Sequence, residues 1–182
     1  MTSRRLALGL AATVAAVVFA TALLLSEPSP DPIGAGQTAP AFELPLLDGA
    51  TISLASLRGR VVLLNFWATW CKPCEDEMPA MERLHTALAG PGFELVAVSA
   101  DASREDVTKF RDRLGLTFPI AQDPDKQVSE AYQSYRFPES YLIDRDGTIL
   151  SRYIGPRDWD TELYVDRIRR VIEGAGAGAV PE

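Results

Sequence analysis

The apolar residues of this chain fall into continuous runs and helical repeats, which predict a protein of alternating strands and helices. The runs 61–67 and 93–99 are almost wholly apolar, as expected of strands that are buried on both faces of a sheet. Between them, residues 71–88 carry apolar side chains at helical spacing and predict a helix. Further helices are predicted at 103–114, 125–135 and 160–173, and a short strand is predicted at 117–121.

Two β-hairpins are predicted where alternating segments flank an Asp-Gly pair, a dipeptide that favours tight turns. The first hairpin precedes the run 61–67, and the second lies before the last helix. They join 42–44 to 51–54 around Asp48-Gly49, and 140–144 to 148–154 around Asp146-Gly147. After the first hairpin the order of elements is β-α-β-α-β-α-β-β-α, which predicts an α/β fold with a mixed sheet and helices on both faces.

The N-terminal segment is strongly apolar. Residues 6–25 carry no charge, follow Arg4 and Arg5, and are numerous enough to cross a bilayer as a helix. The arginines favour an orientation with the N-terminus inside the cell. Residues 1–25 are therefore expected to be a signal anchor and transmembrane helix. A cleaved signal peptide is the alternative, because Ala20-Thr21-Ala22 has the small-x-small pattern of a cleavage site, and the choice between Sec and Tat export stays open.

Composition and charge indicate a single globular domain after this segment. The chain is 47% hydrophobic and 24% charged, with a net charge of −7, which argues against binding to nucleic acid or to anionic lipid. The proline-rich residues 26–32 are expected to form a linker, and the Gly/Ala-rich residues 174–182 a flexible tail. The domain is expected at 33–173, and the protein is expected to be a monomer.

Both cysteines of the chain, Cys71 and Cys74, stand where a buried strand gives way to a helix. A disulfide between them closes too small a loop to stabilise the fold much, so the pair is interpreted as redox-active. Free amides and the dipole at the start of a helix favour the thiolate of Cys71, and Lys72 adds a positive charge nearby. Cys71 is the predicted nucleophile, and the more enclosed Cys74 resolves the mixed disulfide. Pro73 stiffens the loop without costing a hydrogen bond.

Other uses of the two thiols are less well supported by the sequence. A zinc site needs four ligands, and the chain adds only one histidine, His85, to the pair. A copper or haem chaperone would use the dithiol as a pair of ligands. A thiol peroxidase would need a Thr shortly before the attacking cysteine, and Thr69 fills that position, although the surrounding Trp-Cys-Lys-Pro-Cys does not fit such an enzyme.

Residues 65–74, Asn-Phe-Trp-Ala-Thr-Trp-Cys-Lys-Pro-Cys, resemble the active-site stretch of the thioredoxin superfamily. Further motifs narrow the resemblance to the membrane-anchored TlpA/ResA/CcmG-like group, and the match extends from about residue 33 to 173. These motifs are residues 36–42, 47–49, 77–79 and 137–144. The resemblance implies a thioredoxin fold that carries an N-terminal β-hairpin and an inserted helix and strand.

The resemblance also implies roles for residues around the cysteines. Pro138 is implied to be a cis-proline that faces them, next to backbone that pairs with an extended substrate segment. Cytosolic thioredoxins carry a buried Asp where this chain has Asn65, which cannot titrate. Glu77 follows Cys74 by one helical turn, at a position where the family uses a Glu, and we assign it proton transfer with Cys74. The alternative is that Glu77 is a solvated surface acid.

For three other side chains near these motifs, we predict a location or a contact. Trp70, beside the nucleophile, is expected to line the site, whereas Trp67 is expected in the core. Glu139 either contacts the substrate or is a plain surface residue.

Together these observations predict an extracytoplasmic thiol–disulfide oxidoreductase whose only redox group is the Cys71–Cys74 pair, with no other cofactor. In the group that it resembles, the usual role is to reduce protein disulfides, often the haem-binding cysteines of apocytochrome c during cytochrome c maturation. That role implies a CcdA/DsbD-like membrane protein as electron donor. The sequence leaves open the substrate, the direction of transfer and the reduction potential.

Overall fold

The computed structural model describes residues 16, 17, 19–21 and 32–174. The chain divides into two compact units, Met1–Pro32 and Ile33–Glu182. In the first unit the described residues are 16, 17, 19–21 and 32; all are exposed, and all but Pro32 are helical. Most of the predicted signal anchor and linker, and all but one residue of the predicted tail, lie outside the described residues. Within the described part of the chain, no helix is both long and apolar enough to cross a membrane.

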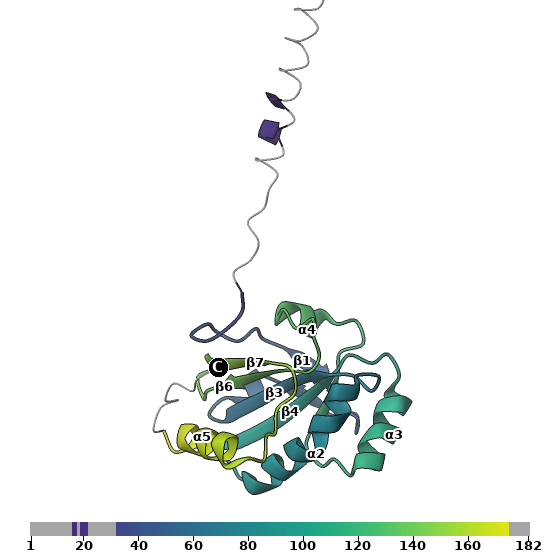
Figure 1. Ribbon diagram of the computed structural model, residues 1–182, viewed down its shortest axis with the longest axis vertical. Coiled ribbons are helices and arrows are strands. Elements are labelled where there is room, and N and C mark those ends of the chain that lie inside the picture. The colour runs from purple at the N-terminus through teal and green to yellow at the C-terminus, as the bar shows by residue number, and fades with distance from the viewer. Residues whose placement is uncertain (1–15, 18, 22–31, 175–182) are drawn as a thin grey trace, which may run out of the picture. The chain divides into compact units, whose positions relative to one another are not determined.

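The second unit is built on a five-stranded mixed sheet with the strand order β5-β4-β3-β6-β7 (Figure 1). Strands β3, β4 and β5 are parallel, whereas β6 is antiparallel to both of its neighbours. These strands are β3 (Val61–Trp67), β4 (Phe93–Ser99), β5 (Ile120–Gln122), β6 (Glu139–Ile143) and β7 (Ile149–Ile154). A separate antiparallel hairpin consists of β1 (Glu43–Pro45) and β2 (Thr51–Ser53).

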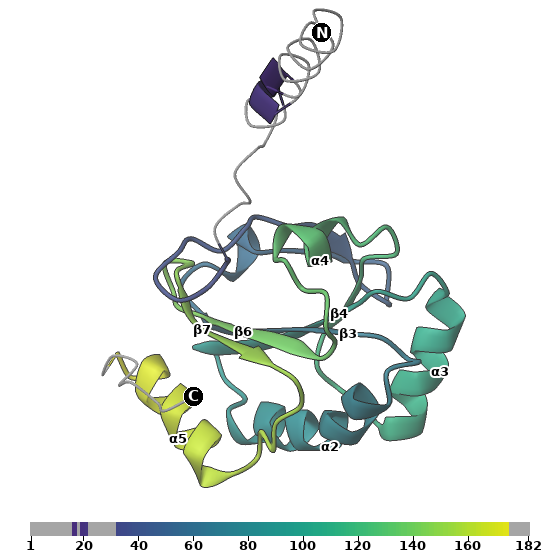
Figure 2. The same ribbon diagram turned by 45° about the horizontal axis from the view of Figure 1, so that its top comes forward.

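Helices cover both faces of this sheet. They are η1 (Ala55–Leu57), α2 (Lys72–Ala87), α3 (Arg104–Leu114), α4 (Gln127–Ala131) and α5 (Glu162–Ile172). Figure 2 shows α2 and α5 on one side of the sheet and α4 on the other side. The predicted mixed sheet between helices is therefore confirmed, as is the hairpin ahead of it.

The central strand β3 divides the core into two clusters because its side chains alternate between the faces of the sheet. Leu63 and Trp67 pack in the cluster that includes residues of α2, α3 and α5. Leu64 and Phe66 pack in the opposite cluster, together with the β1–β2 hairpin and Tyr132, which follows α4. Every residue of β3 is buried, which explains why its sequence is apolar at every position except Asn65.

Helix α3 follows the predicted local signals closely. The Ser103 side chain caps its N-terminus by accepting a hydrogen bond from the Asp106 amide. Gly115 ends the helix with a left-handed φ of 66°, a conformation that suits glycine.

The segment 117–135 differs most from the prediction. Strand β5 begins at Ile120, after Pro119, and helix α4 covers only Gln127–Ala131 rather than 125–135. Two non-glycine residues explain the short helix, because Lys126 has a φ of 56° and Gln133 a φ of 52°. A right-handed helix cannot continue through such residues.

Candidate active site

Cys71 and Cys74 form a disulfide at the N-terminus of α2. Cys71 is the N-cap residue, and its Sγ accepts a hydrogen bond from the Cys74 amide at 3.3 Å. Pro73 lies in the first turn, where the helix needs no amide hydrogen. Cys71 is 6% exposed and Cys74 is fully buried. Cys71, at the N-cap of α2, is therefore the more exposed of the two cysteines, although it too is mostly buried.

Asp101, just after β4, holds the chain that leads to the cysteines. Its carboxylate accepts hydrogen bonds from the Thr69 amide at 2.8 Å and from the Thr69 hydroxyl at 2.7 Å. The Ser99 hydroxyl donates to the same carboxylate. Sequence reasoning missed Asp101. The available signal was an acidic residue two positions after the predicted buried strand 93–99.

Glu77 is buried within the fold rather than solvated. Only 4% of it is exposed, and both carboxylate oxygens accept hydrogen bonds. Oε1 accepts from the Asn65 side-chain amide at 2.9 Å. Oε2 accepts from the Arg157 backbone amide at 3.0 Å and from the Trp159 indole Nε1 at 3.3 Å. The alternative of a surface acid is wrong, because β3 and the segment before α5 enclose this side chain.

Burial changes the acidity of Glu77. Loss of hydration raises its pKa from the ordinary value to about 7. The hydrogen bonds from Arg157, Asn65 and Trp159, and the positive charge of Arg157, all lower that pKa, because each stabilises the carboxylate. The net result is a buried acid whose protonation changes near neutral pH, which suits a proton-transfer group.

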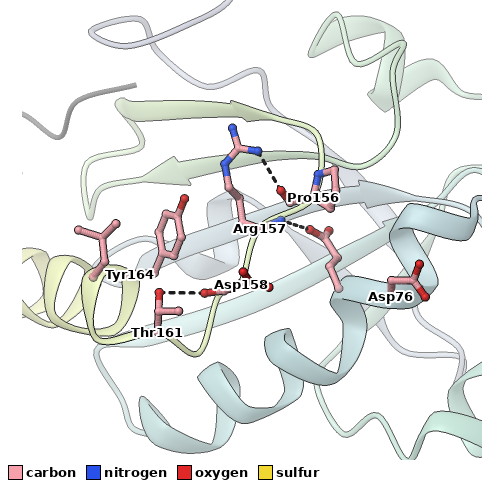
Figure 3. Close-up of a pocket in the computed structure, with 8 residues that line it drawn as sticks. Asp76, Pro156, Arg157, Asp158, Thr161 and Tyr164 are labelled. Atoms are coloured by element: carbon pink, nitrogen blue, oxygen red, sulfur yellow. Dashed lines mark hydrogen bonds between the residues drawn. The ribbon is translucent and has the colours of Figure 1, made fainter.

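Glu77 also lines a pocket of about 570 Å³. Figure 3 shows Asp76 on α2 on one side of it, with the segment Pro156–Asp158 and Tyr164 of α5 on the other. The lining residues are Asp76, Glu77, Pro156, Arg157, Asp158, Thr161, Leu163 and Tyr164. Neither cysteine is among these described lining residues.

The loop before β6 brings further predicted residues together. The Phe137–Pro138 peptide bond is cis, as the resemblance implied, and the Pro138 carbonyl accepts a hydrogen bond from the Gly155 amide. The Trp70 ring is 68% exposed and lies against Phe137, with ring centroids 6.1 Å apart. Trp70, the residue before Cys71 in the chain, therefore lies against the residue that precedes Pro138.

Glu139 has neither of its expected roles. It is 1% exposed, so it neither reaches a substrate nor lies on the surface. One oxygen forms an ion pair with Arg152 at 2.7 Å, and the other accepts the amide hydrogens of Tyr135 and Arg136. Glu139 instead holds the loop that carries Pro138.

Lys72 also differs from its expectation. Its ammonium group contacts Asp76 at 2.7 Å and Glu75 at 3.7 Å. The hydrogen bond to Asp76 is the main reason that the pKa of Lys72 is raised. Two carboxylates of α2 therefore offset the positive charge of Lys72, which was expected to stabilise the Cys71 thiolate. The N-terminus of α2 remains the main local source of positive potential at Cys71.

Comparison with known proteins places this site in a family. The model of the AhpC/TSA family matches residues 35–152, which is more than half of the chain. The chain belongs to the AhpC/TSA family.

Within the described residues, no group of three His, Cys, Asp or Glu side chains is arranged to hold a metal ion.

Relatives narrow the activity within the AhpC/TSA family. The chain is 44% identical over 138 residues to thiol-disulfide oxidoreductase ResA of Geobacillus kaustophilus (strain HTA426), covering 75% of this chain and 79% of the relative. It is 45% identical over 123 residues to thioredoxin-like protein YneN of Bacillus subtilis (strain 168), covering 66% and 71%.

A solved structure supports the same assignment. The protein from Chlorobium tepidum described as thiol:disulfide interchange protein DsbE superposes with a TM-score of 0.70 at 36% identity, covering 76% of this chain and 97% of the other. The fold is thioredoxin-like, as predicted. This member of the AhpC/TSA family is a thiol–disulfide oxidoreductase of the ResA/DsbE type.

Proposed function

We propose that the protein reduces disulfides of extracytoplasmic proteins, with Cys71 as nucleophile, Cys74 as resolving thiol and Glu77 as the proton acceptor of Cys74. The observation that carries this proposal is the placement of Glu77. A carboxylate with a pKa of about 7 lies one helical turn after a cysteine with no solvent contact. A fully buried thiol needs such a partner to lose its proton.

The reaction proceeds in two exchanges. The Cys71 thiolate of the reduced protein attacks a substrate disulfide, which breaks and releases one substrate thiolate as the mixed disulfide forms. Cys74 then gives its proton to Glu77 and attacks the Cys71 sulfur. The second substrate thiolate leaves, and the Cys71–Cys74 disulfide remains. Two electrons pass to the substrate, and the new substrate thiolates take up protons from solvent.

The substrate-binding surface in this proposal is the rim formed by Trp70 and the Pro138 loop. The exposed ring of Trp70 offers apolar contact beside the attacking sulfur. The Pro138 loop is the second part of this surface, because the resemblance to the TlpA/ResA/CcmG-like group implies that an extended substrate segment pairs there. Both features favour a protein substrate over a small disulfide.

The N-terminal segment supports the location and the electron supply that we propose. Its apolar stretch after Arg4 and Arg5 supports a tethered domain outside the cytoplasm. Electrons would then come through the membrane from a CcdA/DsbD-like protein. Apocytochrome c, with its pair of haem-binding cysteines, is the substrate that we propose first.

Substrate trapping tests the proposal. The Cys74→Ser variant of the full chain, expressed in its own cells, should accumulate mixed disulfides between Cys71 and its substrates, because the resolving thiol is missing. The matched control is Cys71→Ser, whose remaining Cys74 is fully buried and should trap nothing. Mass spectrometry of adducts released by dithiothreitol identifies the substrates. A Cys74→Ser protein without adducts would contradict the proposal, and adducts that lack apocytochrome c would exclude that client.

The role of Glu77 has a separate test. The Glu77→Gln variant should slow the resolving step at pH 7, because Gln cannot accept the Cys74 proton, while attack by Cys71 keeps its rate. Stopped-flow measurement of both steps against a peptide disulfide separates them. Equal rates for wild type and variant would mean that Glu77 has no part in proton transfer.

The two rival functions make different predictions. A peroxidase directs a hydroxyl at its attacking thiol, but the Thr69 hydroxyl donates to Asp101. Peroxide turnover by the reduced protein would nonetheless support that function. Stoichiometric Cu(I) binding without disulfide exchange would support a metal chaperone.

A further inference from the structure

Trp159 is a buried tryptophan whose polar edge faces Glu77. It lies in the segment between β7 and α5, and it is 1% exposed. Two tyrosines hold its ring: the Tyr153 centroid lies 5.1 Å away, and the Tyr164 centroid lies 4.9 Å away. This packing fixes the direction of the indole N–H.

The indole donates to a carboxylate that comes from far away in the chain. Trp159 Nε1 lies 3.3 Å from Glu77 Oε2, and the two residues are 82 positions apart. The Arg157 amide donates to the same oxygen. Trp67 is equally buried, but its indole Nε1 has no hydrogen-bond partner among the described residues. A buried indole N–H in this fold therefore does not find a hydrogen-bond acceptor simply because it is buried.

Several groups face Glu77 from the surrounding elements. Asn65 approaches from β3, and Cys74 lies one turn earlier on α2. The pocket side carries Arg157, Asp158 and Tyr164, together with Asp76 from the helix of Glu77 itself. The positive charge of Arg157 favours the carboxylate form of Glu77.

We propose that Trp159 is a positioning residue that holds the Glu77 carboxylate, through its indole N–H, in the orientation that receives the proton of Cys74. The inference deepens the proposed function and rests on it for the role of Glu77. With Asn65 on one oxygen and Trp159 and Arg157 on the other, the carboxylate is held from both sides. A hydrogen bond to a charged acceptor is stronger than one to a neutral acceptor, so this donor also favours the ionised form.

Indole resonances of the unaltered protein provide the first test. In the oxidised state the two cysteines do not titrate, so the ionisation of Glu77 can be followed alone. The Trp159 Nε1–H resonance should shift between pH 5 and pH 9 with a midpoint near 7. The indoles of Trp67 and Trp70 serve as internal controls and should shift much less. A Trp159 resonance that stays constant with pH would overturn the proposal.

The second test removes the N–H while keeping an aromatic ring. In Trp159→Phe, the midpoint of Glu77, measured from its ¹³C carboxyl resonance, should rise by about one pH unit, because the anion loses a donor. At pH 7 the ionised fraction then falls from about one half to about one tenth, and the resolving step should slow about fivefold. The matched control is Trp67→Phe, which truncates an equally buried tryptophan without removing a hydrogen bond, and there the midpoint should not change.

The outcomes separate this inference from the proposed function. If Glu77→Gln slows the resolving step but Trp159→Phe leaves the Glu77 midpoint unchanged, Trp159 has no positioning role and the proposed function stands. If Trp159→Phe shifts the midpoint but Glu77→Gln has no effect on exchange, Trp159 holds a carboxylate that does not take part in the reaction, and both proposals fail. If Trp159→Phe does not fold, the indole titration of the unaltered protein still decides.

Discussion

Glutamate side chains are rarely buried without an ion-pair partner, and Glu77 is held by three uncharged donor groups instead. These donors stabilise the carboxylate, but they do not fully replace water, so its pKa stays near 7. The burial of Glu77 therefore suits it to proton transfer but lowers the stability of the folded protein. Its ionised form weakens the fold, and this cost depends on pH in a predictable direction.

The stability of the oxidised protein should reflect this cost. Glu77 has a higher pKa in the folded state than in the unfolded chain, so the folded state binds more protons between pH 4.5 and pH 7. Its contribution to the free energy of unfolding is fully present below pH 4.5 and is lost as pH rises through 7, by about 3 kcal/mol. Urea unfolding at several pH values should show that Glu77→Gln lacks this decline. Asp76→Asn, which removes a neighbouring exposed acid, should keep it.

The loop between α4 and β6 is held in place by one buried charged group, the carboxylate of Glu139. Glu139 binds two amides of this loop and the guanidinium of Arg152 on β7. Arg152 also donates to the Gln133 and Ile33 carbonyls. The loop that carries Pro138 is thus tied both to the neighbouring strand and to the start of the domain.

Removal of that charge should be costly. The Glu139→Ala change leaves Arg152 partly buried without its carboxylate and frees two loop amides, so we expect a loss of about 3 kcal/mol in the free energy of unfolding. Chemical denaturation of the oxidised protein measures the loss. The control Glu130→Ala removes an exposed acid and should change the stability by less than about 0.5 kcal/mol. A comparable small loss for Glu139→Ala would mean that the ion pair does not stabilise the fold.

Helix α3 offers a prediction that depends on local structure alone. Ser103→Ala removes the side-chain acceptor of the Asp106 amide and should cost about 1 kcal/mol. Ser103→Thr retains a hydroxyl at the N-cap and should recover most of that stability. Denaturant midpoints of the two variants check this order, which would be reversed or absent if the cap were unimportant.

Across the whole domain, the first residues of the second unit close the edge of the sheet beside β7. The Gly36 amide and the Gln37 carbonyl bond to Ile149 of β7, and Thr38 forms a bridge to Thr148. The Tyr132 hydroxyl donates to the Pro40 carbonyl. The contacts with Thr148 and Ile149 pair backbone groups at the start of β7, on the outer side of the edge strand.

Two deletions test this view of the domain. A chain that begins at residue 32 keeps every one of these contacts and should unfold at the same temperature as the full chain. A chain that begins at residue 41 loses them and should unfold at least about 10 °C lower, since several hydrogen bonds and the buried Ala39 are removed together. Calorimetry of the oxidised proteins distinguishes the cases, and equal melting temperatures would show that residues 32–40 do not stabilise the domain.

The pattern and spacing of residues in the sequence predicted those structural features whose cause lies within a few neighbouring residues. The buried strand β3, the helix that begins after Cys71, the caps of α3 and the hairpin turns all follow from such local causes, and the family motifs supplied the cis form of Pro138. Only the tertiary structure decided the partners of buried charges. Glu77 meets Trp159 from 82 residues away, and Glu139 meets Arg152 across a strand pair, because folding brings these groups together and no local pattern encodes the contact.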